Sequence, residues 1–75
     1  MVSIEEIIEK AGGARALAEA LGITRPAVLH WRSRGLKVPP IVHAEIIEAV
    51  TGIPKEKIWV DYYERLKNLK RESNG

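Results

Sequence analysis

The sequence has no cysteine among its 75 residues, which excludes a disulfide framework and a metal site built on thiolates. No apolar run approaches the length of a membrane span, and the opening stretch MVSIEEIIEK lacks the basic start of a secretory signal peptide. Internal repeats and low-complexity segments are also missing. These absences suit a protein of a reducing cell interior, and we expect a cytoplasmic location with no membrane contact.

The length and the 45% content of hydrophobic residues predict one small globular domain. Ser3 and Glu6 form a capping box that predicts the start of a first helix, and Gly12-Gly13 predicts its end. Helical spacing of apolar residues predicts further helices near 14–20, 24–34 and 39–51. We therefore expect an all-α fold of about five short helices, with one domain at 1–70 and a frayed polar tail at 71–75.

The expected core consists of the apolar residues that share one face of each predicted helix. These are Ile4, Ile7, Ile8 and Ala11, then Leu17, Ala18 and Leu21, then Val28 and Trp31, and finally Ile46, Ile47 and Val50. The pattern is ambiguous beyond Gly52. Residues 54–58 fit one helical turn and Asp61 fits the cap of a last helix, but residues 57–60 fit a short strand equally well.

Acidic residues are absent from residues 24–37, a segment that carries Arg25, Arg32, Arg34 and Lys37. The flanking segments 1–23 and 38–53 each have a net charge of −2, whereas residues 24–37 have a net charge of +4. A basic segment of this kind attracts phosphate groups when it lies on one face of a protein.

A proline stands near the start of the predicted helix 24–34. Pro26 falls in the first turn, where the amides have no partner within the helix, so the proline removes no helical hydrogen bond. Two caps fit this sequence. Thr24 is one, with its hydroxyl accepting from the Ala27 amide, and Arg25 is the other, with Pro26 at the first helical position.

A helical wheel of residues 24–34 separates an inner arc, Val28 and Trp31, from an outer arc that holds Pro26, His30 and Ser33, with Leu29 at its edge. Arg25 and Arg34 flank the outer arc. Arginine binds guanine in two places at once and apolar groups contact the thymine methyl, so this face suits the major groove of DNA.

The run ARALAEALGITRPAVLHW at residues 14–31 resembles the helix-turn-helix of phage Cro and CI-type repressors, and the wider resemblance to small Cro-like or antitoxin-like regulators spans residues 11–60. The positions that match are Leu17, Ala18, Leu21, Gly22, Ile23, Val28 and Trp31. This resemblance implies a lambda-repressor-like fold whose second motif helix, at 24–34, enters the major groove.

The resemblance, combined with the wheel, assigns two sets of DNA contacts. The residues expected to contact bases are Arg25, Pro26, Leu29, His30 and Ser33. The residues expected to contact phosphates are Thr24, Arg32, Arg34 and Lys37. Family members often carry glutamine or asparagine at the base-contacting positions, so this chain favours guanine and thymine over adenine.

We expect a DNA-binding transcriptional repressor of a bacterial or phage-infected cell, with no enzymatic activity, no cofactor and no metal. A homodimer on double-stranded DNA is expected, formed through the region from Ile53 to Leu69, with a weak dimer or a monomer when free. His43 is expected to be a packed or half-exposed side chain. Two alternatives stay open: an antitoxin-like regulator that binds DNA and a protein partner, and a protein-interaction module that does not bind DNA.

Overall fold

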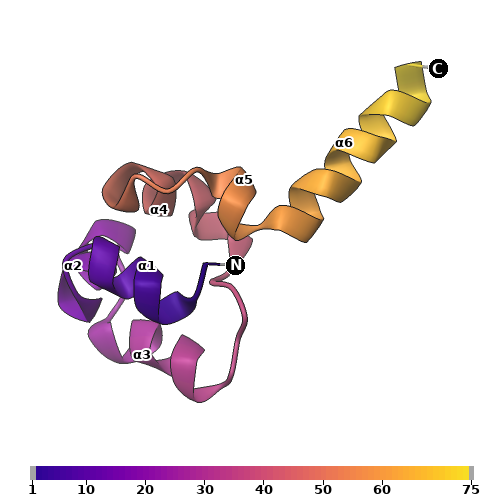
Figure 1. Cartoon of the computed structure of the whole chain (residues 1–75). Helices are drawn as coiled ribbons and strands as arrows, with labels where there is room; N and C mark the ends of the chain where they lie inside the picture. Colours follow the sequence, from indigo (N-terminus) through magenta and orange to yellow (C-terminus); the bar gives the residue numbers. More distant parts are fainter. Residues whose placement is uncertain (1, 75) are drawn as a thin grey trace.

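A computed structural model describes residues 2–74, and the side chains of residues 2–70. Its helices are α1 (Ile4–Lys10), α2 (Ala14–Leu21), α3 (Arg25–Ser33), the 3-10 helix η1 (Ile41–His43), α4 (Ala44–Thr51), α5 (Lys55–Ile58) and α6 (Val60–Asn74). No strand occurs within the described residues, which confirms the all-α prediction. Helices α1 to α5 form a globule, and α6 projects from it (Figure 1).

Helix α1 begins and ends where the sequence predicts. The Ser3 hydroxyl accepts a hydrogen bond from the Glu6 amide at 3.1 Å, and the helix ends before Gly12 and Gly13, which both have positive φ. Ile4 and Ile7 face the core, and Val2 packs against it from outside the helix. These three apolar side chains therefore hold the start of α1 against the core.

The turn between α2 and α3 consists of residues 22–24. Gly22 adopts a left-handed conformation with φ 72°, which glycine reaches without the steric penalty of a Cβ atom. Thr24 caps α3, since its hydroxyl accepts from the Ala27 amide at 3.3 Å. Of the two caps that fit the sequence, the structure selects Thr24, and Pro26 lies in the first turn as expected.

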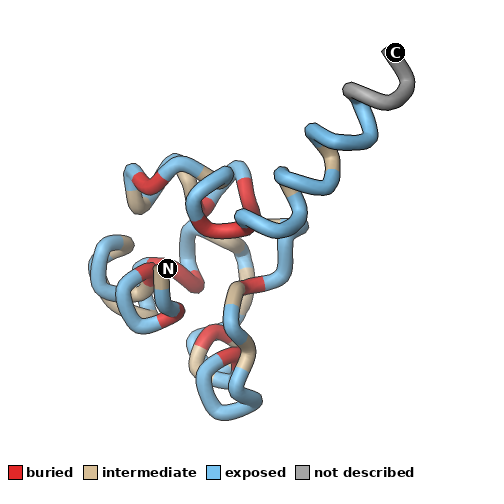
Figure 2. Tube along the Cα trace, turned by 45° about the vertical axis from the view of Figure 1, so that its right-hand side comes forward, coloured by how far each residue is buried: buried red, intermediate tan, exposed pale blue. Residues whose placement is uncertain are grey.

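One hydrophobic core joins α1 to α5 and the start of α6. The buried side chains are Ile4, Ile7, Leu17, Ala18, Val28, Trp31, Ala44, Ile47, Ile53, Ile58 and Trp59. Figure 2 shows these buried positions on the inner sides of the helices. Leu21 and Ile23, on either side of the turn glycine, are partly buried against the core. The inner faces predicted for α1, α2 and α3 are thus confirmed.

The prediction for the fourth helix was wrong in its start and in two of its three inner residues, and it was confirmed for Ile47. The prolines do not begin the α-helix: Pro40 precedes η1, whose first turn is closed by a hydrogen bond from the His43 amide to the Pro40 carbonyl at 3.1 Å. This 3-10 turn changes which side of α4 faces the core. Ala44 and Ile47 are buried, whereas Ile46 and Val50 are exposed.

Beyond Gly52 the chain is helical, so the strand considered for residues 57–60 does not form. Helix α6 begins at Val60, and Asp61 therefore lies in its first turn and is not its cap.

Glu48 accepts a hydrogen bond from the Lys55 amide at 2.8 Å and Glu45 accepts one from the Lys55 ammonium, which holds α5 against α4. The bond to Glu45 raises the pKa of Lys55. The tail predicted for residues 71–75 has side chains outside the described part and stays a prediction.

The α5–α6 junction is anchored by Trp59. This side chain is buried, and its indole N–H donates to the Pro39 carbonyl at 2.8 Å, across 20 positions of the chain. The bond ties the end of α5 to the segment that leads from α3 to η1. Pro39 is itself fully buried, so its carbonyl has little access to water as an alternative partner.

We predict that Trp59→Phe lowers the free energy of unfolding by about 1–3 kcal/mol beyond the effect of the lost ring volume, because it leaves a buried carbonyl without its donor. Trp31→Phe is the matched control: Trp31 is also buried, and its indole makes no hydrogen bond within the described residues. Urea unfolding followed by circular dichroism measures both. Equal losses of stability would show that the bond to Pro39 contributes nothing.

Candidate nucleic-acid interface

The outer face of α3 carries the side chains predicted to contact bases. Arg25, Pro26, His30 and Ser33 are exposed, and Leu29 is partly exposed. The inner face of the same helix is fixed by Val28 and Trp31, which are 0% and 7% exposed. Because the two buried residues lie three apart, one side of α3 is held against the core while the other faces solvent along its length.

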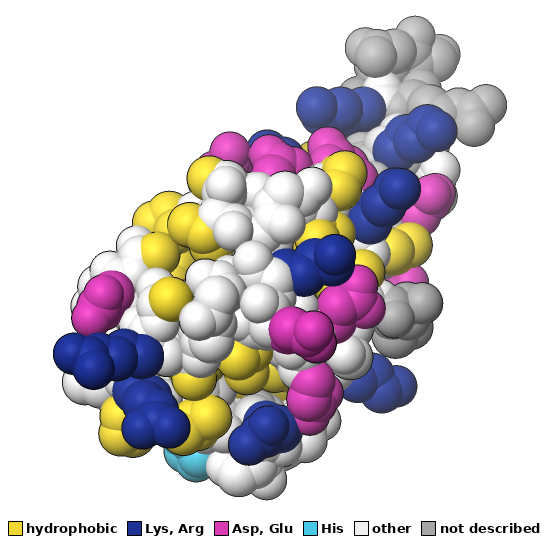
Figure 3. All heavy atoms as spheres, turned by 60° about the vertical axis from the view of Figure 1, so that its left-hand side comes forward, with side chains coloured by type: hydrophobic (Ala, Val, Ile, Leu, Met, Phe, Trp, Pro, Cys, Tyr) yellow, Lys and Arg dark blue, Asp and Glu magenta, His cyan; other side chains and the backbone are white. Residues whose placement is uncertain are grey.

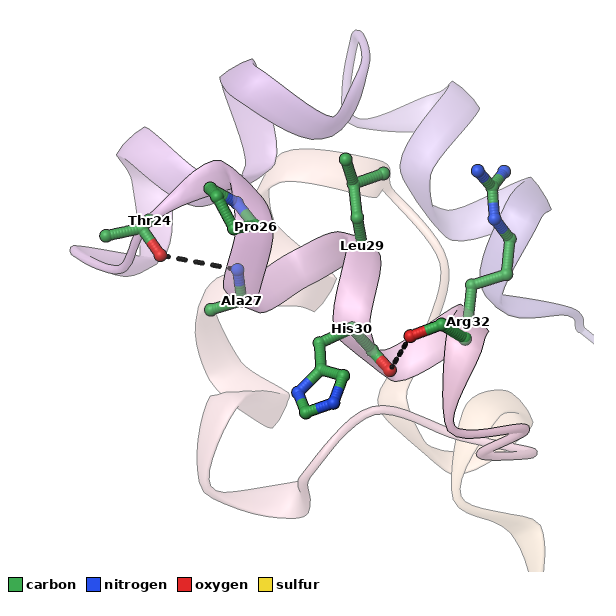
Figure 4. Close-up of a pocket in the computed structure, with 7 residues that line it drawn as sticks. Thr24, Pro26, Ala27, Leu29, His30 and Arg32 are labelled. Carbon is green, nitrogen blue, oxygen red and sulfur yellow. Dashed lines mark hydrogen bonds between the residues drawn. The ribbon is translucent and has the colours of Figure 1, made fainter.

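An open hollow runs along this outer face. Its lining residues are Thr24, Pro26, Ala27, Leu29, His30, Arg32 and Ser33. Figure 4 shows the labelled ones projecting from successive turns of α3, with the other helices behind it. Of the nine predicted contact residues, Arg25, Arg34 and Lys37 do not line the hollow. They are exposed beside it, Arg25 at the start of α3 and the other two beyond its end.

Sequence reasoning missed Ala27, which lines the hollow between Pro26 and His30. Its position three residues before His30 places it on the same face of α3, and that spacing was available as a signal. A small side chain here lets another molecule approach the helix backbone closely. Together with Pro26 and Leu29, Ala27 makes the N-terminal half of the hollow apolar.

The two hydroxyl side chains of this face differ in what they can offer. The Thr24 oxygen accepts from the Ala27 amide, so its own hydrogen stays available to an external acceptor such as a phosphate oxygen. The Ser33 hydroxyl donates to the His30 carbonyl at 3.1 Å (Figure 4). The Ser33 oxygen therefore stays available only as a hydrogen-bond acceptor.

Arg32, Arg34 and Lys37 are exposed, and none of them has an acidic partner within the described part of the chain. By contrast, Arg15 pairs with Glu19 on α2. Figure 3 shows basic side chains beside apolar side chains and a histidine at the lower end of the molecule, the end where α3 lies. The positive charge predicted from residues 24–37 is thus unneutralised on the surface.

The first turns of the α-helices differ in charge. Helices α1, α4, α5 and α6 each have an acidic residue there, whereas α2 and α3 have none. Both N-termini keep the partial positive charge of the helix dipole, but only α2 keeps several unpaired amides, because in α3 Pro26 has no amide N–H and the Ala27 amide donates to Thr24. Gly13 caps α2 without a side-chain hydrogen bond, which leaves those amides open. The start of α2 can therefore offer open amides to an anion, whereas the start of α3 offers the helix dipole and the Thr24 hydroxyl hydrogen.

His43 packs beside the core and does not belong to the outer face of α3. The His43 ring lies 5.9 Å from the Trp31 ring, centroid to centroid, and is partly buried, as expected.

No cluster of three or more His, Asp or Glu side chains among the described residues is arranged to hold a metal ion. Within the same residues, no helix combines the length and the apolar character that crossing a bilayer requires.

Comparison with known proteins gives one relationship. No curated protein and no solved structure matches the chain. Residues 4–63, by contrast, match the family described as "Bacterial toxin YdaS". This match covers α1 to α5 and the first residues of α6, and it includes the whole α2–α3 unit and the outer face of α3. The chain therefore belongs to this family of small bacterial proteins.

Proposed function

We propose that this protein is a transcriptional regulator that binds double-stranded DNA at specific sequences and represses by covering an operator. The outer face of α3 carries this proposal. It presents arginine, histidine, hydroxyl and apolar groups to solvent on a helix whose other side is locked into the core. The major groove of B-DNA is wide enough to admit one α-helix with such a face.

In this arrangement the exposed side chains of α3 read base edges. Arg25, at the first position of the helix, binds guanine O6 and N7. His30 reaches a base acceptor or donor, and the apolar surface of Pro26, Ala27 and Leu29 takes a thymine methyl. Ser33 accepts a hydrogen bond from a base amino group.

Phosphate contacts on both sides of the groove hold the helix in register. Thr24 donates its free hydroxyl hydrogen to one strand at the start of α3. Arg32, Arg34 and Lys37 extend from the other end of the helix, and the open amides at the start of α2 supply a further contact. Such contacts add affinity to every sequence alike.

One α3 helix reads too few base pairs to select an operator in a genome, so two copies act together on adjacent half-sites. A bound dimer blocks polymerase by its bulk, and this mechanism needs no enzymatic step and no cofactor. The family membership supports a small bacterial regulator at a coarser level.

Arg25→Ala is expected to weaken binding to the operator by about 1–3 kcal/mol and to relax the preference at one base pair. Arg34→Ala also removes one positive charge. It is expected to weaken binding to matched and mismatched duplexes alike, because phosphates carry no sequence information. Fluorescence anisotropy on an operator and its single-base variants measures both effects. Identical behaviour of the two variants would contradict the division into base and phosphate contacts.

The affinity for duplex DNA is expected to fall steeply with salt, because each phosphate contact releases bound counterions. Arg34→Ala should lower the slope of log K against log salt by about 1. Lys57→Ala is the matched control, since Lys57 is an exposed cation on α5, outside the proposed interface. A slope that changes equally in both variants would place the DNA elsewhere on the protein.

The family description favours a second candidate, a member of a toxin–antitoxin pair that binds DNA and also a protein partner. That partner would contact the exposed apolar side chains of η1 and α4. Val42 is the most exposed of them, with 81% of its surface accessible. Expression of the chain in a bacterial host tests this candidate. Growth arrest that persists in Arg25→Ala but disappears in Val42→Glu would support it, and growth arrest lost in Arg25→Ala alone would point to DNA.

A further inference from the structure

Helix α6 extends away from the core that stabilises the rest of the chain (Figure 1). The principal extents are 45 × 23 × 20 Å and the radius of gyration is 13.6 Å. A compact domain of this length has a radius of gyration of about 11 Å. Beyond Tyr63, which packs against the core, the helix has few neighbours within the described residues.

A helix this long is only marginally stable in water without packing. Isolated helices of roughly 12–15 residues reach that margin even with favourable composition, and α6 has 15 residues. It also exposes apolar surface: Tyr62 is 51% exposed and Leu69 is 55% exposed. Helix stability in proteins comes mainly from burying one such face, so α6 lacks in the monomer the contact that would hold its second half.

The apolar residues of α6 form a seam. Tyr62, Leu66 and Leu69 are separated by four and then three positions, the spacing at which side chains line one side of a helix that pairs with another helix. Ile53, Ile58 and Trp59 belong to the region expected to form the dimer, but they are buried in the core. The surface left for a second chain in this region is therefore α6 itself.

The charges of α6 are divided between its two halves. Within residues 61–70, which span the apolar side chains, the first five residues carry Asp61, Glu64 and Arg65 with a net charge of −1, and the last five carry Lys67 and Lys70 with a net charge of +2. When two copies of α6 lie antiparallel, the negative half of each lies beside the positive half of the other, and the helix dipoles also oppose favourably. A parallel pair would place like charges together along the whole contact.

We propose that two copies of this protein associate through an antiparallel pair of α6 helices, with Tyr62, Leu66 and Leu69 as the buried seam. The contact is two-fold symmetric, so each chain supplies the same surface and the assembly closes at two. It would join the two copies of the proposed regulator. The association itself is measured without DNA, so its failure and the failure of DNA binding are separate results.

Sedimentation equilibrium of the full chain over a wide concentration range tests this proposal. A reversible monomer–dimer equilibrium is expected, and Leu69→Glu should raise its dissociation constant at least tenfold. Asn68→Glu is the matched control: it adds the same charge one position away, off the seam, and should change the constant far less. Circular dichroism confirms that each variant keeps its fold.

The salt dependence of the dimer and the variant Val42→Glu test the geometry of the contact. The dissociation constant should rise with salt, because an antiparallel pair is held partly by attraction between opposite charges. Val42→Glu, on the exposed apolar surface of η1, should leave the dimer intact. A chain that is monomeric at all concentrations, a dimer that tightens with salt, or a dimer lost in Val42→Glu and kept in Leu69→Glu would overturn the proposal.

Discussion

The burial of Val28 and Trp31 decides which side of α3 faces solvent, and the proposed function depends on it. Both residues belong to the cluster that also contains Leu17 and Ala18 of α2, so α2 and α3 pack on each other through small and apolar groups. The turn of residues 22–24 leaves little freedom between the two helices, and Gly22 supplies the left-handed residue that it needs. With the inner face fixed, every polar residue on the opposite side of α3 is presented to solvent as a group.

This constraint explains how so small a domain can offer an ordered binding surface. The side chains around the hollow project from α3 and from its cap Thr24, and the orientation of α3 is set by the core. The electrostatics act in the same direction, because the basic residues near α3 have no acidic partners in the described residues and the first turns of α2 and α3 carry no acid. Anions therefore meet a surface with its positive charges and amides already in place.

The sequence predicted the part of the fold in which local signals and packing agree. Ser3, the pair Gly12-Gly13 and the apolar spacing of α1 to α3 each point to the structure that forms, and the outer face of α3 followed from the wheel. The errors have one local cause and one non-local cause. A 3-10 turn after Pro40 rotated α4 so that Ile46 and Val50 became exposed, and the bond from Trp59 to Pro39, across 20 positions, holds the α5–α6 junction that the pattern left open between helix and strand. Among site residues, Ala27 was missed because a small apolar side chain carries no chemical signal of its own.

The most direct test of the central claim is selection of random duplex DNA by the purified protein, followed by sequencing of the retained molecules. If α3 reads the major groove in a two-fold dimer, the retained DNA will be enriched in an inverted repeat whose half-sites lie about one helical turn apart, with guanine or thymine at the contacted positions. No enrichment, together with binding that stays weak even at low salt, would contradict the account and show that the outer face of α3 does not bind DNA.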